Sequence, residues 1–211
     1  MTFFEDDQFL ATCGIRLNTP ILIYSVKNFN LLLSTYVNGF AIDLFVINNF
    51  IGEYNLNTAK KPRKKEKNLE NMFIICTYTD IICFTYKDDH FITNEINIAE
   101  HKVTSKIKCG TALRINIKNP SLMAHAEEGD KTNLIITGHK NGQVLIWEQF
   151  ALRSELANYK NEILNIGNSQ LGVVIATDAA TLHFVIFTFT FNFIFLFCFL
   201  VESLCQRNRT T

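Results

Sequence analysis

The feature that most constrains the fold is a hairpin signature at residues 133–148, which read NLIITGHKNGQVLIWE. Two runs of β-favouring residues, 134–137 and 144–147, flank the pair Asn141-Gly142. This pair suits a two-residue type I′ turn, because both central positions of that turn need a positive φ. Both runs are nearly continuous in apolar residues, as expected for strands that are buried on both faces. The segment therefore predicts an interior hairpin of an all-β protein.

The same pattern recurs along the chain. Residues 73–86 and 173–186 align without gaps on residues 134–147, and residues 9–24 have the same form with a longer turn. From Ile136 to Ile175 is 175 − 136 = 39 residues, close to the roughly 40–45 residues of one propeller blade. Loop insertions near 57–70 and 119–132 lengthen the other spacings. The repetition predicts four blade-like units, of which the last is incomplete.

Further strands fit the same plan. Residues 31–36 are the expected outer strand of the first unit, and residues 41–47 the inner strand of the second. Residues 112–117 and 162–166 are the expected inner strands of the third and fourth units. Each of these segments alternates or is rich in β-favouring residues.

From about residue 9 to residue 185 the chain resembles WD40-repeat proteins, most strongly in the third unit. There Gly138 lies before the turn, Asn141-Gly142 stands for the usual Asp-Gly, and Trp147-Glu148 stands for Trp-Asp. In the first two units a tyrosine replaces the tryptophan. The Gly-His pair that follows an outer strand in this family is absent, and the resemblance therefore predicts no buried His–Ser–Asp–Trp network.

The resemblance implies a partial WD40-like β-propeller of about three to four blades that acts as a non-catalytic scaffold for protein–protein interaction. Degenerate blades with long insertions resemble those of microtubule-associated and ciliary proteins, which implies a cytoplasmic place in a cytoskeletal or ciliary assembly. A ring of about seven blades needs roughly 280–315 residues. This chain has 211, so another chain or further sequence is expected to complete the ring.

The sequence offers little chemistry. It contains no GxGxxG, GxxxxGK[ST], GxSxG or HExxH motif, and its five histidines are scattered. Its six cysteines form no Cys-x-x-Cys pair; they are expected to be buried thiols, although a bridge between Cys76 and Cys83 is conceivable. The net charge is zero, which favours no specific nucleic acid. We predict no catalytic residue, no cofactor and no metal.

A basic segment interrupts the second unit. Its positive charges are Lys60, Lys61, Arg63, Lys64, Lys65 and Lys67. Pro62 predicts a loop. The segment is a candidate docking loop for an acidic surface or a nuclear-localisation patch, and the competing interpretation is a solvated insertion.

The C-terminal region supports an alternative function. Residues 182–201 are mostly apolar and carry no charge, which is the length and character of a membrane-spanning helix. The alternative is thus a membrane-anchored protein with a β-rich cytosolic domain. However, phenylalanine recurs at every second position from 187 to 199, which is the strand period. A third hypothesis is non-native read-through. We divide the chain into blades at 1–186 and a Phe-rich tail at 187–211.

Overall fold

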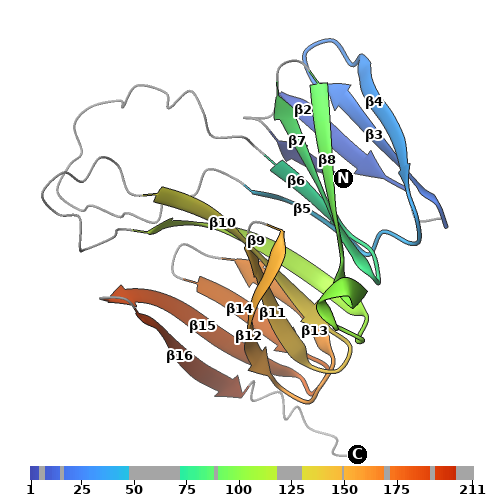
Figure 1. The fold of residues 1–211 in the computed structure, drawn as a ribbon. Coiled ribbons are helices and arrows are strands. Elements are labelled where there is room, and N and C mark those ends of the chain that lie inside the picture. The colour runs from blue at the N-terminus through green and yellow to red at the C-terminus, as the bar shows by residue number, and fades with distance from the viewer. Residues whose placement is uncertain are drawn as a thin grey trace, which may run out of the picture.

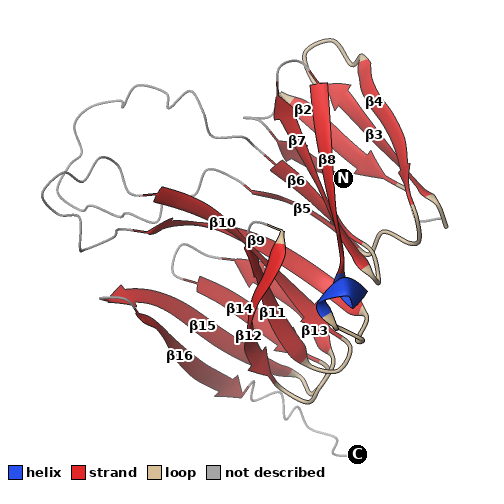
Figure 2. Cartoon of the chain, in the orientation of Figure 1, coloured by secondary structure: helices blue, strands red, loops and turns tan. Residues whose placement is uncertain are grey.

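The computed structural model describes residues 1–4, 8–14, 17–47, 72–87, 90–117, 130–148, 150–168, 172–190 and 193–202. Within these ranges the chain forms four four-stranded sheets, all with antiparallel pairing, and one short 3-10 helix (Figure 1; Figure 2). In each sheet the strands follow one another in chain order, so each sheet is a meander. The predicted all-β class is confirmed.

The four sheets are the blades of the protein. Blade 1 contains β1 (Thr2–Phe4), β2 (Phe9–Cys13), β3 (Thr19–Ser25) and β4 (Leu31–Val37). Blade 2 contains β5 (Asp43–Ile47), β6 (Met72–Cys76), β7 (Asp80–Lys87) and β8 (His90–Asn97), and is followed by the 3-10 helix η1 (Ile98–His101). Blade 3 contains β9 (Ile107–Ile117), β10 (Asp130–His139), β11 (Gln143–Glu148) and β12 (Ala151–Asn158). Blade 4 contains β13 (Ile163–Asn168), β14 (Gly172–Thr177), β15 (Thr181–Thr190) and β16 (Phe193–Glu202).

The blades are arranged as a sector of a β-propeller. The first strands of successive blades lie against one another, with β1 beside β5, β5 beside β9 and β9 beside β13. The chain therefore runs from the inner to the outer strand of a blade and then returns to the inner strand of the next blade (Figure 1). This arrangement leaves the fourth strand of each blade at the outside.

Three apolar cores hold the blades together, one between each pair of neighbours. Side chains alternate between the cores along a strand: Phe73 and Ile75 pack toward blade 1, whereas Ile74 and Cys76 pack toward blade 3. Because successive side chains of a strand point to opposite faces, a strand between two cores must be apolar at every position. This explains the continuous apolar runs of the sequence.

The predicted hairpins are confirmed in all four blades, as are the four additional strands. The prediction of an incomplete fourth unit is wrong, because β13 to β16 form a full four-stranded sheet. The inner strand β1 and the outer strands β8 and β12 were not predicted. They are short or carry polar residues on both faces, so they lack the continuous apolar pattern that marks the middle strands.

The C-terminal region differs from the helix that a membrane anchor would need. Its described backbone forms β15 and β16, which pair along their length from Thr181↔Glu202 to Thr190↔Phe193. No helix in the described part of the chain has the length and apolar character to cross a membrane. Strand β15 runs across position 186. The division of the chain into blades and tail at this position stays a prediction, as does the hypothesis that the sequence after it is non-native read-through.

Two predicted loops lie mostly outside the described residues. The insertion near 57–70, which includes the basic segment, is outside them entirely. Of the insertion near 119–132, residues 130–132 form the start of β10 and the remainder is outside. The role of the basic segment therefore remains a prediction.

Candidate functional site

The surface considered as a candidate site lies at one end of the blades, and we call it the turn face. It consists of the turns between the second and third strands (77–79, 140–142 and 178–180) together with the connections between blades (38–42, 98–106 and 159–162). Figure 2 shows these loops in tan, gathered beside η1 at one edge of the sheets. Such an end surface of a propeller joins segments that are far apart in sequence.

Backbone hydrogen bonds tie these loops to one another. The connection before blade 3 is bonded on both sides: Ile107 N–H donates to the carbonyl of Tyr78 at 3.0 Å, and Lys140 N–H donates to the carbonyl of Lys106 at 2.9 Å. The next connection is held similarly, since Tyr159 N–H donates to the carbonyl of Gly142 at 3.0 Å. The turn face is therefore a continuous, cross-linked surface rather than a set of independent loops.

A buried side-chain network lies directly beneath the turn face. Trp147 Nε1–H donates to Thr137 Oγ1 at 2.8 Å, and Thr137 Oγ1 lies 2.9 Å from His139 Nε2. His139 Nδ1 lies 2.9 Å from the carbonyl oxygen of Ser105. Because a carbonyl only accepts, Nδ1 carries the proton, and Nε2 accepts from the Thr137 hydroxyl. Every polar group in this chain of bonds is thus satisfied.

This network differs from the His–Ser–Asp–Trp network of the family pattern, because a threonine and a backbone carbonyl take part in it and no aspartate does. The family pattern places its histidine after an outer strand, whereas here His139 comes from the end of β10 itself. Its ring reaches the connection before blade 3 through Ser105, and the hydroxyl of Ser105 accepts from Asn141 N–H at 3.1 Å. The sequence contained a signal for this network. Thr137 and His139 are two residues apart, which places them on one face of a strand, and both lie within ten residues of the only tryptophan.

The turn itself differs from the predicted type I′ geometry. Asn141 does not have a positive φ, and Gly142 does, at +87°. Gly142 N–H donates to the carbonyl of His139 at 3.1 Å, so the loop has three residues, Lys140 to Gly142. This is a type I turn followed by a left-handed residue that forms a bulge. The Asn141 side chain stabilises it by accepting from Gln143 N–H at 3.2 Å.

Gly138 is required by the contact between blades 3 and 4. A Cβ atom at this position would lie 2.4 Å from Ile163 Cγ2 and 2.9 Å from Cys109 Sγ. Glycine therefore lets β10 approach β13 more closely than any other residue would.

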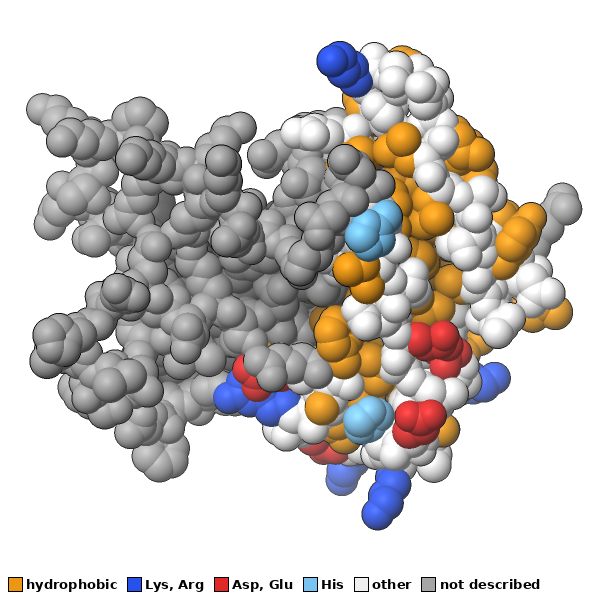
Figure 3. Space-filling view, turned by 45° about the horizontal axis from the view of Figure 1, so that its top comes forward, with side chains coloured by type: hydrophobic (Ala, Val, Ile, Leu, Met, Phe, Trp, Pro, Cys, Tyr) orange, Lys and Arg blue, Asp and Glu red, His pale blue; other side chains and the backbone are white. Residues whose placement is uncertain are grey.

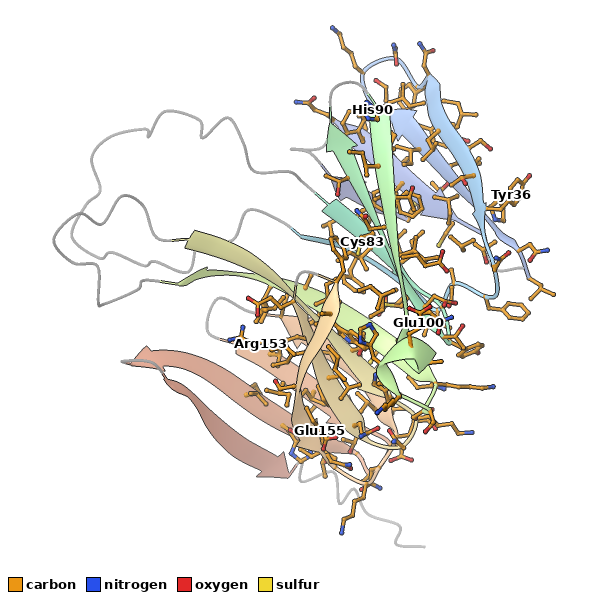
Figure 4. The ribbon with its side chains drawn as sticks, in the orientation of Figure 1. Tyr36, Cys83, His90, Glu100, Arg153 and Glu155 are labelled. Atoms are coloured by element: carbon orange, nitrogen blue, oxygen red, sulfur yellow. The ribbon has the colours of Figure 1, made fainter. Side chains whose placement is uncertain are left out.

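The remaining signature residues lie apart. Trp147 is fully buried between blades 2 and 3 and has His101 of η1 edge-on at 5.3 Å between ring centroids. Glu148 lies at the far end of β11 and pairs at 2.9 Å with Arg153 of β12, which is labelled in Figure 4. Only Gly138, Asn141 and Gly142 lie at or next to the turn face. The sequence signature thus marks a blade and does not define one site.

The electrostatics of the buried groups indicate structural roles. Desolvation lowers the pKa of His139, although its hydrogen bond to Ser105 acts in the opposite direction. Burial raises the pKa of Cys83 and of Cys109 to about 12, and it raises the pKa of Cys76 well above the usual value of a thiol. A thiol with such a pKa stays protonated at neutral pH and is a poor nucleophile or metal ligand. Cys76 and Cys83 are free thiols, and no group of His, Cys, Asp and Glu among the described residues is arranged to hold a metal ion.

Charge is distributed unevenly over the surface. Figure 3 shows charged side chains concentrated toward the lower part of the view and an extensive hydrophobic surface above them. On the turn face four lysines are exposed, at positions 102, 106, 140 and 160. Sequence reasoning missed them because they come from three separate segments, and no local pattern connects them.

No family model matches the sequence, and no curated protein matches it. A crystal structure of BBS1N in complex with ARL6DN, soaked with lead, matches 82% of this chain and 51% of that chain, at 12% identity and a TM-score of 0.46. The mercury-soaked crystal of that complex matches 83% and 45%, at 10% identity and a TM-score of 0.40. The chain thus spans about half the length of these proteins, and the propeller assignment rests on its own strand topology.

Proposed function

We propose that this chain is a non-catalytic, WD40-type scaffold that binds other proteins through its turn face. The observation that supports the proposal is the set of hydrogen bonds that join the turns and connections of blades 2, 3 and 4. Ordered loops on a rigid scaffold lose little conformational entropy on binding. A surface of this kind suits partner recognition.

The chemistry of the described residues supports a binding role over catalysis. Its histidines at positions 139 and 183 are engaged in hydrogen bonds with threonines, and its buried thiols are protonated. An active site normally combines a nucleophile, a base and a place for substrate within hydrogen-bonding reach of one another. We find no such combination in the described part of the chain.

The proposal includes a place in the cell. The degenerate blades and long insertions of the sequence favour a cytoskeletal or ciliary assembly in the cytoplasm. We also propose that another chain or further sequence packs on the terminal blades and completes the ring, because each internal blade is stabilised by neighbours on both faces.

Affinity capture with matched variants tests the interaction role. Thr104→Glu with Asn161→Glu changes two exposed positions of the turn face, and Ser34→Glu with Ser154→Glu makes the same charge change on outer strands. We expect mass spectrometry to find proteins that the wild type and the outer-strand variant retain and the turn-face variant loses. If both variants lose the same proteins, or neither loses any, the turn face is not the binding surface.

A further inference from the structure

Four exposed lysines lie on the turn face, three of them on or next to one hairpin turn, and we call them the lysine arc: Lys102, Lys106, Lys140 and Lys160. Lys140 is part of the β10–β11 turn, and its backbone is bonded to that of Lys106. On the other side of the turn, a Cβ atom at Gly142 would lie 2.6 Å from the backbone nitrogen of Lys160. Lys102 lies on the same connection as Lys106. Three segments that are distant in sequence therefore converge on one turn.

The arc is not neutralised by neighbouring acids. Two other basic side chains have acidic partners: Lys108 pairs with Glu162 at 2.6 Å, and Arg153 pairs with Glu148 at 2.9 Å. None of the four arc lysines forms an ion pair with a described residue, and Lys106 instead lies over the ring of Tyr78, 5.2 Å from its centroid. The acids on the turn face that remain without an ion pair in the described structure are Glu100 on η1 (Figure 4) and Asp178. The arc thus carries an excess of positive charge.

Two arc lysines occupy backbone conformations that favour other residues. Lys102 and Lys160 have φ values of +61° and +60°. Glycine or asparagine adopts this left-handed conformation with less strain. Ala180 has the same conformation in the β14–β15 turn, so the strain belongs to the turns. Lys102 and Lys160 differ from the other non-glycine residues with a positive φ in the described structure in that their side chains are charged.

We propose that the lysine arc binds an acidic, Asp/Glu-rich segment of a partner protein. This inference rests on the proposed interaction role of the turn face and names the chemistry of the partner. A nucleic acid fits less well, because the chain has no net charge and the arc contains no arginine for bidentate phosphate contacts. A membrane surface fits less well because the exposed large hydrophobic side chain described beside the lysines, Tyr78, lies under the ammonium group of Lys106.

Fluorescence anisotropy tests the proposal, with a labelled peptide of alternating glutamate and serine added to the full chain. The arc variant is Lys106→Gln with Lys140→Gln, and the matched control is Lys27→Gln with Arg153→Gln, which removes the same charge from exposed positions elsewhere. Both are also made in a background with Lys60, Lys61, Lys64 and Lys65 changed to glutamine, which removes competition from the basic segment. We expect the arc variant to weaken binding about tenfold in both backgrounds and the control to stay near wild type.

A second variant separates binding from folding. Lys102→Asn with Lys160→Asn relieves the left-handed strain, so it should leave the unfolding midpoint unchanged or raise it while weakening peptide binding. The proposal is overturned if arc and control variants bind alike, or if the basic-segment background abolishes binding. It is also overturned if an oligothymidine or phosphatidylserine vesicles bind more tightly than the peptide. If captured partners still depend on Thr104 and Asn161 in that case, the interaction role stands and only the acidic class of partner is refuted.

Discussion

Replacing Thr137 with valine should destabilise the protein far more than the loss of one hydroxyl suggests. The substitution keeps the shape of the side chain but removes the oxygen that lies between Trp147 Nε1–H and His139 Nε2. Both nitrogens are in the interior, where water cannot replace the lost partner. An unsatisfied buried polar group costs about 1–3 kcal/mol, so two of them lower the free energy of unfolding by about 2–6 kcal/mol. That is a large share of the roughly 5–15 kcal/mol by which domains are stable.

Two control variants isolate the network. Thr137→Ser retains the hydroxyl and should cost only about 1 kcal/mol for the lost methyl group. Thr111→Val makes the same chemical change at another buried threonine of blade 3, whose hydroxyl is bonded to none of the described residues. It should be close to neutral.

The only tryptophan of the chain provides the assay. Trp147 is fully buried and is retained in all three variants, so its emission shifts to longer wavelength when urea exposes the indole. The free energy of unfolding follows from the linear dependence on urea concentration. If Thr137→Val is no more destabilising than Thr137→Ser or Thr111→Val, the network contributes nothing and our interpretation of the blade 3 interior is wrong.

Three further predictions use the same assay. The pKa values of His139 and His183 are lowered by burial, so the folded state disfavours their protonation. The free energy of unfolding should therefore be highest above the unfolded pKa of about 6.5 and should fall as the pH decreases below that value. A urea midpoint of the wild type that stays unchanged down to pH 5 would contradict this. Gly138→Ala should cost about 1–3 kcal/mol because its Cβ has no room, whereas Gly167→Ala, with nothing within 4 Å, should be nearly neutral, and equal effects would refute the packing argument. Glu148→Gln should change stability by less than about 1 kcal/mol, because its ion pair is partly exposed, and a larger loss would show that Glu148 has a role beyond this pair.

The middle strands of each blade could be predicted from the sequence because burial on both faces leaves a continuous apolar run. The outer strand β8 could not, since its burial alternates only weakly and its exposed positions mix polar residues with one isoleucine, Ile92. The turn type was mispredicted for a local reason: Asn141-Gly142 fits a type I′ turn, but the bond from Lys140 N–H to Lys106 favours a three-residue loop. A tertiary contact therefore overrode the local preference of two residues.

The candidate site was less predictable than the fold for a related reason. Each arc lysine is an ordinary charged residue within its own segment, and the arc exists only where three segments meet. The residues that identify a blade, such as Gly138 and Trp147, satisfy packing between blades and face inward. The proposed recognition surface consists of loops, where the sequence carries no repeating pattern.

The network and the arc meet in a single hairpin, and this links stability to binding. The Ser105 hydroxyl accepts a hydrogen bond from Asn141 N–H on the surface side, and the Ser105 carbonyl accepts one from His139 Nδ1–H on the buried side. When His139 is protonated, Nε2 carries a hydrogen and can no longer accept from the Thr137 hydroxyl. Protonation therefore opposes the Thr137–His139 hydrogen bond, through which the imidazole is linked to Trp147. The turn that carries Lys140 is anchored through the same histidine. Acidification should therefore loosen the lysine arc before the blades separate, and acidic-peptide binding should weaken at a higher pH than the one at which Trp147 becomes exposed. Simultaneous loss of binding and of buried emission would show that the turn has no local freedom and that the hairpin opens only with the whole sector.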